Sequence, residues 1–215
     1  MKPEFYITIG RELGSGGFEI GKRLAERFGI PFYDKELINL ASKESGICKE
    51  FFEKADEIRT QKFTSGFFGL NFSSIFSDVA STSPIDNAEL FRIQSDVIRR
   101  LAAAGSAVFV GRCADYILRD EENCLNVFVC SSIPVRIERL RNSNKIKGVD
   151  KLTDGQIIDE LEKWDKKRSG YYNYFSYKKW GYASSYNICL DSSCLDIDKC
   201  VDIVAGIVSE KFLSR

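Results

Sequence analysis

A cluster of glycines near the start of the chain has the spacing of a phosphate-binding loop. It lies between an apolar run at 5–10 and a segment of helical period, and it consists of Gly10, Gly14, Gly16 and Gly17. Successive backbone N–H groups in such a turn can point at one phosphate, and glycines leave room for its approach. A plain strand-to-helix turn would use the same residues. Because open sheets bind ligands where a strand passes into a helix, we interpret Gly14, Ser15, Gly16 and Gly17 as the site for a nucleotide cofactor.

The loop has no lysine at the position where phosphate-binding loops usually carry one. Alignment with the end of a Walker A motif places Gly17 at the lysine and Glu19 at the serine or threonine that holds Mg²⁺. Arg11 lies inside the loop, closer to the expected phosphates than Lys22, and a guanidinium can hold a phosphate with two hydrogen bonds. We therefore predict that Arg11 is a catalytic residue. The alternative is that Arg11 only forms an ion pair with Glu12 or Glu19.

The composition narrows the classes of reaction. The 215 residues include no histidine, which excludes Ser-His-Asp and Cys-His catalysis and zinc sites built with imidazole. Phosphoryl transfer remains, because it depends on positioning and on cations around the phosphates. The 31 basic residues equal the 31 acidic ones in number, so no overall field attracts nucleic acid or an anionic membrane.

The cysteines and the apolar runs indicate the compartment. Seven cysteines are an odd number and form no C-x-x-C pair, which predicts free thiols in a reducing cytoplasm. No apolar window approaches the roughly 20 residues that a membrane span needs, and no apolar leader precedes the first run. We expect a cytoplasmic protein with no membrane or nucleic-acid partner, and the sequence leaves its oligomeric state open.

Short apolar runs alternate with longer segments of helical period, which predicts an α/β fold with a parallel sheet covered by helices. The five predicted strands are 5–10, 30–33, 106–111, 125–130 and 186–191. Four helical segments are predicted as well: one ending at Gly29, one over 86–104, one around 157–164 and one over 197–208. We expect a single domain over 1–215, with an irregular insertion near 60–84 where Ser, Gly and Phe are frequent.

Several segments together carry a resemblance to a known family. They are "GRELGSGGFEIGKRLAE", "IPFYDKELI", "VGRCADYIL", "VRIERLR", "WDKKRSGYYNYF" and "LDSSCLDIDK". In these segments the chain resembles the cytidylate-kinase-like family of P-loop nucleoside monophosphate kinases. The resemblance implies a three-layer α/β/α P-loop fold with a five-stranded sheet and a helical lid near 136–182. It also implies transfer of the γ-phosphate of ATP, with Mg²⁺, to CMP or a related monophosphate.

The resemblance also suggests roles for charged residues. Arg112 directly follows a predicted strand, so its side chain should face the glycine-rich loop, and the matching arginine of the family binds the acceptor phosphate. Pairing with Asp115 is the alternative. The remaining predictions are Arg139 and Arg168 as catalytic arginines, Arg136 at the cofactor, and Asp34, Lys35 and Asp165 at the substrate. Charged residues on helices are more often only solvated, and the metal ligands are left open.

Departures from the family pattern leave three functions open. Val110 stands where the kinases carry an Asp, and Leu40 stands at the arginine of a second motif. The chain can therefore be an active monophosphate kinase, a nucleotide-binding protein without turnover, or a kinase of another small molecule. The aromatic and basic run "YYNYFSYKKWGY" resembles a nucleic-acid platform, but the zero net charge argues against that use.

Overall fold

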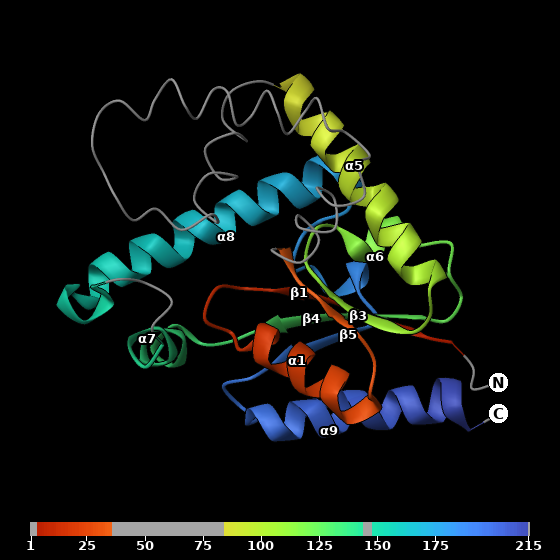
Figure 1. Cartoon of the computed structure of the whole chain (residues 1–215). Coiled ribbons are helices and arrows are strands. Elements are labelled where there is room, and N and C mark those ends of the chain that lie inside the picture. Colours follow the sequence, from red (N-terminus) through yellow and green to blue (C-terminus); the bar gives the residue numbers. More distant parts are fainter. Residues whose placement is uncertain (1–3, 36–83, 144–147, 215) are drawn as a thin grey trace. The chain divides into compact units, whose positions relative to one another are not determined.

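The computed structural model of the chain describes residues 4–35, 84–143 and 148–214 (Figure 1). The chain divides into two compact units, 1–34 with 102–215, and 35–101. Of the second unit, most of the described part is one helix, α5 (Pro84–Ala103), where the sequence predicts a helix over 86–104. The predicted insertion near 60–84 lies outside the described residues, apart from Pro84. The prediction of a single domain stays a prediction.

The first unit is built on a sheet of five parallel strands. They are β1 (Tyr6–Arg11), β2 (Phe32–Tyr33), β3 (Ala107–Val110), β4 (Cys124–Cys130) and β5 (Ile188–Asp191), in the order β2-β3-β1-β4-β5. The central strands are apolar on both faces, as a sheet covered on both sides requires, and Ile7, Val108 and Val127 are fully buried. The predicted α/β fold with a five-stranded parallel sheet is confirmed.

Helices cover the two faces of this sheet (Figure 1). The helices of this unit are α1 (Gly17–Phe28), α6 (Ala114–Ile117), α7 (Ile133–Arg141), α8 (Asp154–Ser176) and α9 (Ile197–Val208), and shorter turns are Val149–Lys151, Ala183–Ser185 and the π-helical Ser209–Leu213. Ile20 and Leu24 of α1 and Val204 of α9 share one core with the sheet. None of the described helices is both long and apolar enough to span a membrane.

Two strands, β2 and β5, begin two residues later than the sequence predicts, for reasons of backbone hydrogen bonding. The Ile30 N–H donates to the Ala25 carbonyl at 3.0 Å and completes the end of α1, so it does not join the sheet. Pro31 has no N–H to offer to a neighbouring strand. At β5, the Tyr186 N–H donates to the Ala183 carbonyl at 3.2 Å and closes a turn, so the strand begins two residues later than predicted.

A buried carboxyl group joins α6 to α8. The Tyr172 hydroxyl donates to Asp115 Oδ2 at 2.6 Å, and the two residues are 5% and 6% exposed. Burial raises the pKa of Asp115, and the hydrogen bond from Tyr172 acts in the opposite direction. Among the described residues, Asp115 forms no ion pair with Arg112 within 4.0 Å, so the pairing of these two residues is not found.

Removing this hydroxyl should destabilise the fold. Tyr172→Phe keeps the ring but leaves a buried carboxyl group with one donor fewer, which is expected to cost about 1–3 kcal/mol of unfolding free energy. Urea unfolding measures the loss, and Tyr174→Phe is the control because Tyr174 is 65% exposed. Equal stability of the two variants would show that the hydrogen bond contributes nothing.

Candidate functional site

The glycine-rich loop between β1 and α1 has the backbone of an anion-binding turn. Gly14 and Gly16 have φ values of 77° and 82°, a left-handed conformation that glycine adopts without strain. Ser15 between them is fully buried, and its hydroxyl donates to the Glu12 carbonyl at 2.9 Å. Because Gly16 immediately precedes α1, the first N–H groups of that helix have no partner within the helix and can donate to an anion.

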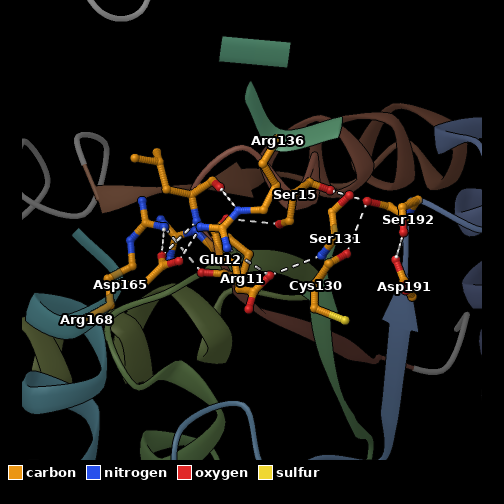
Figure 2. A network of polar contacts seen from close by, with 12 residues as sticks. Arg11, Glu12, Ser15, Cys130, Ser131, Arg136, Asp165, Arg168, Asp191 and Ser192 are labelled. Carbon is orange, nitrogen blue, oxygen red and sulfur yellow. Dashed lines mark hydrogen bonds and ion pairs between the residues drawn. The ribbon is translucent and has the colours of Figure 1, made fainter. Parts of the chain in front are cut away.

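An ion-pair network holds the loop from the side of α7 and α8 (Figure 2). The Leu13 N–H donates to Asp165 Oδ1 at 2.8 Å, and Arg136 Nε donates to the Leu13 carbonyl at 2.6 Å. The Arg136 guanidinium also pairs with Asp165 Oδ2 and, at 3.4 Å, with Glu12 Oε2. Both backbone polar groups of Leu13, its N–H and its carbonyl, are therefore held by side chains.

This network changes the interpretation of two predicted site residues. Arg136 is only 5% exposed, and three acceptors surround its guanidinium. Arg136 therefore supports the loop from within the protein in this structure, and its predicted place at the cofactor stays a prediction. Asp165 is held in the same way by Leu13, Arg136 and Arg168, so in this conformation it is also part of the support.

Neither glutamate near the loop pairs with Arg11. Glu12 Oε2 accepts from the Ser131 N–H at 3.1 Å, and burial raises the pKa of Glu12. Glu19 accepts from Arg23 Nε at 2.7 Å. The alternative that Arg11 serves only as the partner of one of these glutamates is wrong. In the motif the hydroxyl residue directly follows the lysine, so the alignment is corrected: Phe18, and not Glu19, stands at the position of the residue that holds Mg²⁺.

Arg139 ties the loop to the turn between β5 and α9. Arg139 Nη1 donates to the Ser15 carbonyl at 3.0 Å and to Ser192 Oγ at 2.8 Å, and Nη2 donates to the Ser192 carbonyl at 2.8 Å. Ser192 Oγ in turn donates to the Ser15 carbonyl at 2.6 Å. Arg139 thus lies directly at the loop, as expected of a residue of the site. Ser192 was missed, although it is a small hydroxyl residue just after a predicted strand, which was the available signal.

Three arginines meet at the carboxyl ends of β1 and β3. Arg168 Nη1 donates to the Arg11 carbonyl at 3.3 Å, and Arg112 lies over the Tyr171 ring, with Cζ 5.5 Å from the ring centroid. Burial, then the charges of Arg168 and Arg112, lower the pKa of Arg11 to about 9, while Asp34 and Asp165 act in the opposite direction. Arg11 therefore remains a cation at pH 7, within a cluster of like charges.

The cluster has few carboxylates to balance it. Within the described residues, no carboxylate lies within 4.0 Å of the guanidinium of Arg11 or of Arg112, and Arg168 reaches Asp165 Oδ1 at 3.5 Å. Arg112 and Cys113 also have φ values of 57° and 56°, a conformation that costs energy for residues with a Cβ and is frequent at functional sites. Cations packed together in this way favour a bound anion.

The structure gives fewer contacts for the remaining predicted site residues, Asp34 and Lys35. Asp34 directly follows β2, and its charge acts on Arg11. Lys35 belongs to the second unit, and its role stays a prediction. Over residues 4–35, 84–143 and 148–214, no group of three or more His, Cys, Asp and Glu side chains could hold a metal ion. All six described cysteines are free.

Comparisons with known proteins show the family and the fold of the chain. A sequence model of the cytidylate kinase-like family matches residues 6–194. No curated protein sequence matched. An uncharacterised protein from Eubacterium ventriosum is 25% identical with a TM-score of 0.71, and the match covers 97% of this chain and 100% of that one.

Two kinases share the fold at lower identity. A shikimate kinase from Bacteroides thetaiotaomicron is 14% identical with a TM-score of 0.54, covering 95% of this chain and 98% of that one. A gluconokinase from Sinorhizobium meliloti is 12% identical with a TM-score of 0.54, covering 99% and 95%. The fold is that of P-loop kinases, and the chain belongs to the cytidylate kinase-like family.

Proposed function

We propose that the protein transfers the γ-phosphate of ATP to an acceptor that itself carries a phosphate, CMP or a related nucleoside monophosphate. The observation that carries the proposal is the cluster of Arg11, Arg112 and Arg168 beside the glycine-rich loop. Phosphoryl transfer between two anions requires cations at the point where they meet, and this cluster supplies them. Membership of the cytidylate kinase-like family supports a nucleotide as substrate.

The residues divide the work between two sites. The backbone N–H groups of residues 14–17 bind the phosphates of the donor, and Arg139 keeps this loop in place through Ser15 and Ser192. Arg112 holds the phosphate of the acceptor. Mg²⁺, if bound with ATP, would supply further positive charge at the phosphates, although no group of three or more His, Cys, Asp and Glu side chains among the described residues would hold it. Arg11 and Arg168 stabilise the negative charge that spreads over the transferring group, a contribution that can exceed 10³-fold in rate.

The reaction needs no covalent enzyme intermediate. An oxygen of the acceptor phosphate attacks the γ-phosphorus, the bond from γ-phosphorus to the bridging oxygen breaks, and ADP leaves with that electron pair. The protein contributes position and positive charge, which agrees with a chain that contains no histidine.

One observation favours a second candidate, a nucleotide-binding protein without turnover. Gly17 and Phe18 stand where a lysine and a hydroxyl residue normally contact the phosphates and Mg²⁺. A third candidate is phosphorylation of a small molecule other than a nucleotide, because a shikimate kinase and a gluconokinase share the fold.

A coupled assay of ADP release separates the three. The protein is incubated with ATP and, in turn, CMP, UMP, AMP, GMP, shikimate and gluconate, with and without Mg²⁺. We expect Mg²⁺-dependent release with CMP or another monophosphate and none with the two non-nucleotides. Release only with a non-nucleotide would favour the third candidate, and tight ATP binding with no release would favour the second.

A further inference from the structure

Positions 11 and 17 of the loop carry a cationic residue and a glycine in the reverse order to the usual phosphate-binding motif. In the motif G-x-x-x-x-G-K the lysine follows the first glycine by six residues. With Gly16 as the second glycine, the first glycine position is 11 and the lysine position is 17. This chain carries an arginine at 11 and a glycine at 17.

The structure shows why only one of these positions can carry a side chain. A Cβ added at Gly17 would lie 2.6 Å from Arg11 Cβ and 3.2 Å from Arg11 Cγ. The distance of 2.6 Å is far inside van der Waals contact, and Arg11 Cβ is fixed to the backbone, where it cannot move aside. The distance of 3.2 Å is tight, as is the 3.3 Å from the added Cβ to Val129 Cβ. Gly17 does not have a positive φ, so no backbone conformation requires glycine there. The glycine at 17 is explained by the volume of Arg11.

A second glycine makes room for the other end of Arg11. A Cβ added at Gly111 would lie 1.9 Å from Arg11 Nη1 and 2.9 Å from Cζ. The guanidinium therefore lies against the backbone of Gly111, the residue before Arg112. Its φ of 80° gives Gly111 a separate reason to be glycine.

We propose that Arg11, at the first glycine position of the motif, replaces the lysine that is missing at position 17. The positive charge of the loop then lies on the side of the acceptor and not on the side of the donor. A lysine at 17 would start from α1, whereas Arg11 starts from the end of β1 and crosses to Gly111. There it joins Arg112 and Arg168 in one site for a doubly charged phosphate group. This inference rests on the proposed function for the identity of the acceptor, but not for the binding of anions.

The steric conflict between Arg11 and a side chain at position 17 can be tested by thermal stability, without an assay of enzyme activity. Gly17→Ala is expected to lower the melting temperature by about 2–12 °C, because overpacking typically costs 1–3 kcal/mol. The same change in an Arg11→Gly background should cost less than half as much, because the opposing Cβ is gone. In an Arg11→Ala background the full cost should remain, because that Cβ is retained. Gly206→Ala is the matched control, since an added Cβ there meets nothing within 4 Å.

The assignment of the Arg11 charge to the acceptor side is tested by calorimetry with two probes, ADP and inorganic phosphate. Arg11→Gly and Arg11→Ala should each weaken phosphate binding about 10-fold to 150-fold, the range for a hydrogen bond to a charged group, and weaken ADP binding less than about 3-fold. Arg11→Gly with Gly17→Lys should bind ADP more tightly than Arg11→Gly does and should leave phosphate binding weak, because the cation is returned to the donor side.

The two possible failures are distinguishable. An equal cost of Gly17→Ala in the parent and in Arg11→Gly would overturn the steric exchange. An equal loss of ADP and phosphate binding on removal of Arg11 would overturn the assignment to the acceptor side. Both measurements can succeed in a protein that binds nucleotide without turnover, so they do not depend on the ADP-release assay.

Discussion

Replacing Arg112 with alanine is expected to raise the KM of the monophosphate acceptor about 30-fold to 1,000-fold while leaving ATP binding nearly unchanged. A charge-assisted contact of a guanidinium with a phosphate supports a loss of roughly 2–4 kcal/mol. Arg112 follows Gly111, against which the Arg11 guanidinium lies, so the proposed division of the site places the loss on the acceptor. Steady-state kinetics at saturating ATP measure the KM, and calorimetry measures ATP affinity.

Two further variants make this result specific. Arg119→Ala is the control. Arg119 packs over the Tyr116 ring, donates to the Tyr116 carbonyl and pairs with Asp120 at 3.7 Å, so KM should stay at the parent value. Arg112→Lys keeps the charge without the two-pronged geometry and should recover part of the affinity. Equal losses for acceptor and donor in Arg112→Ala would contradict a division of the site into two halves.

Replacing Arg136 with alanine should cost about 3–5 kcal/mol of unfolding free energy. Removing one partner of a buried ion pair leaves the opposite charge uncompensated. Here Glu12 would lose its cation, and Asp165 would keep only the more distant Arg168, at 3.5 Å. The Leu13 carbonyl would also lose a donor. Urea unfolding at pH 7 measures the change, which is a large part of the stability of an ordinary domain.

An arginine on the same helix provides the control. Arg141 pairs with Asp154 at 2.6 Å, but the pair is exposed, so Arg141→Ala should cost less than about 1 kcal/mol. If Arg136→Ala were equally mild but weakened ATP binding strongly, Arg136 would be a ligand of the nucleotide, as the sequence first suggested. The buried network would then be a minor contribution to stability.

The fold could be predicted because its signals are local. Each central strand is a short apolar run between helical segments, and α1 ends at Gly29, whose φ of 65° is the left-handed helix end that glycine favours. The errors lie at strand ends, where a single backbone bond decides the boundary. The spacing of apolar residues in the sequence indicates neither the hydrogen bond from Ile30 to Ala25 nor the turn at Tyr186.

From the residues alone, without the family resemblance, the place of a charged side chain could be predicted where the residue follows a strand. Arg11 and Arg112 stand at the ends of β1 and β3, and parallel strands bring such ends to one edge of the sheet. The support of the loop was not foreseen, because it depends on how α7 and α8 pack against Leu13. A basic residue on a helix looks the same in the sequence whether it faces solvent or, like Arg136, lies buried between two carboxylates.

The most direct test of phosphotransfer follows the phosphate itself. ATP carrying a radioactive γ-phosphate is incubated with the protein, Mg²⁺ and each nucleoside monophosphate, and the products are separated and counted. We expect the label in a nucleoside diphosphate, with transfer to CMP or a close relative, and a strong reduction in Arg112→Ala at limiting acceptor. Label that stays in ATP while ATP and the monophosphate both bind the protein would contradict an active kinase, and the site would then be one for nucleotide binding alone.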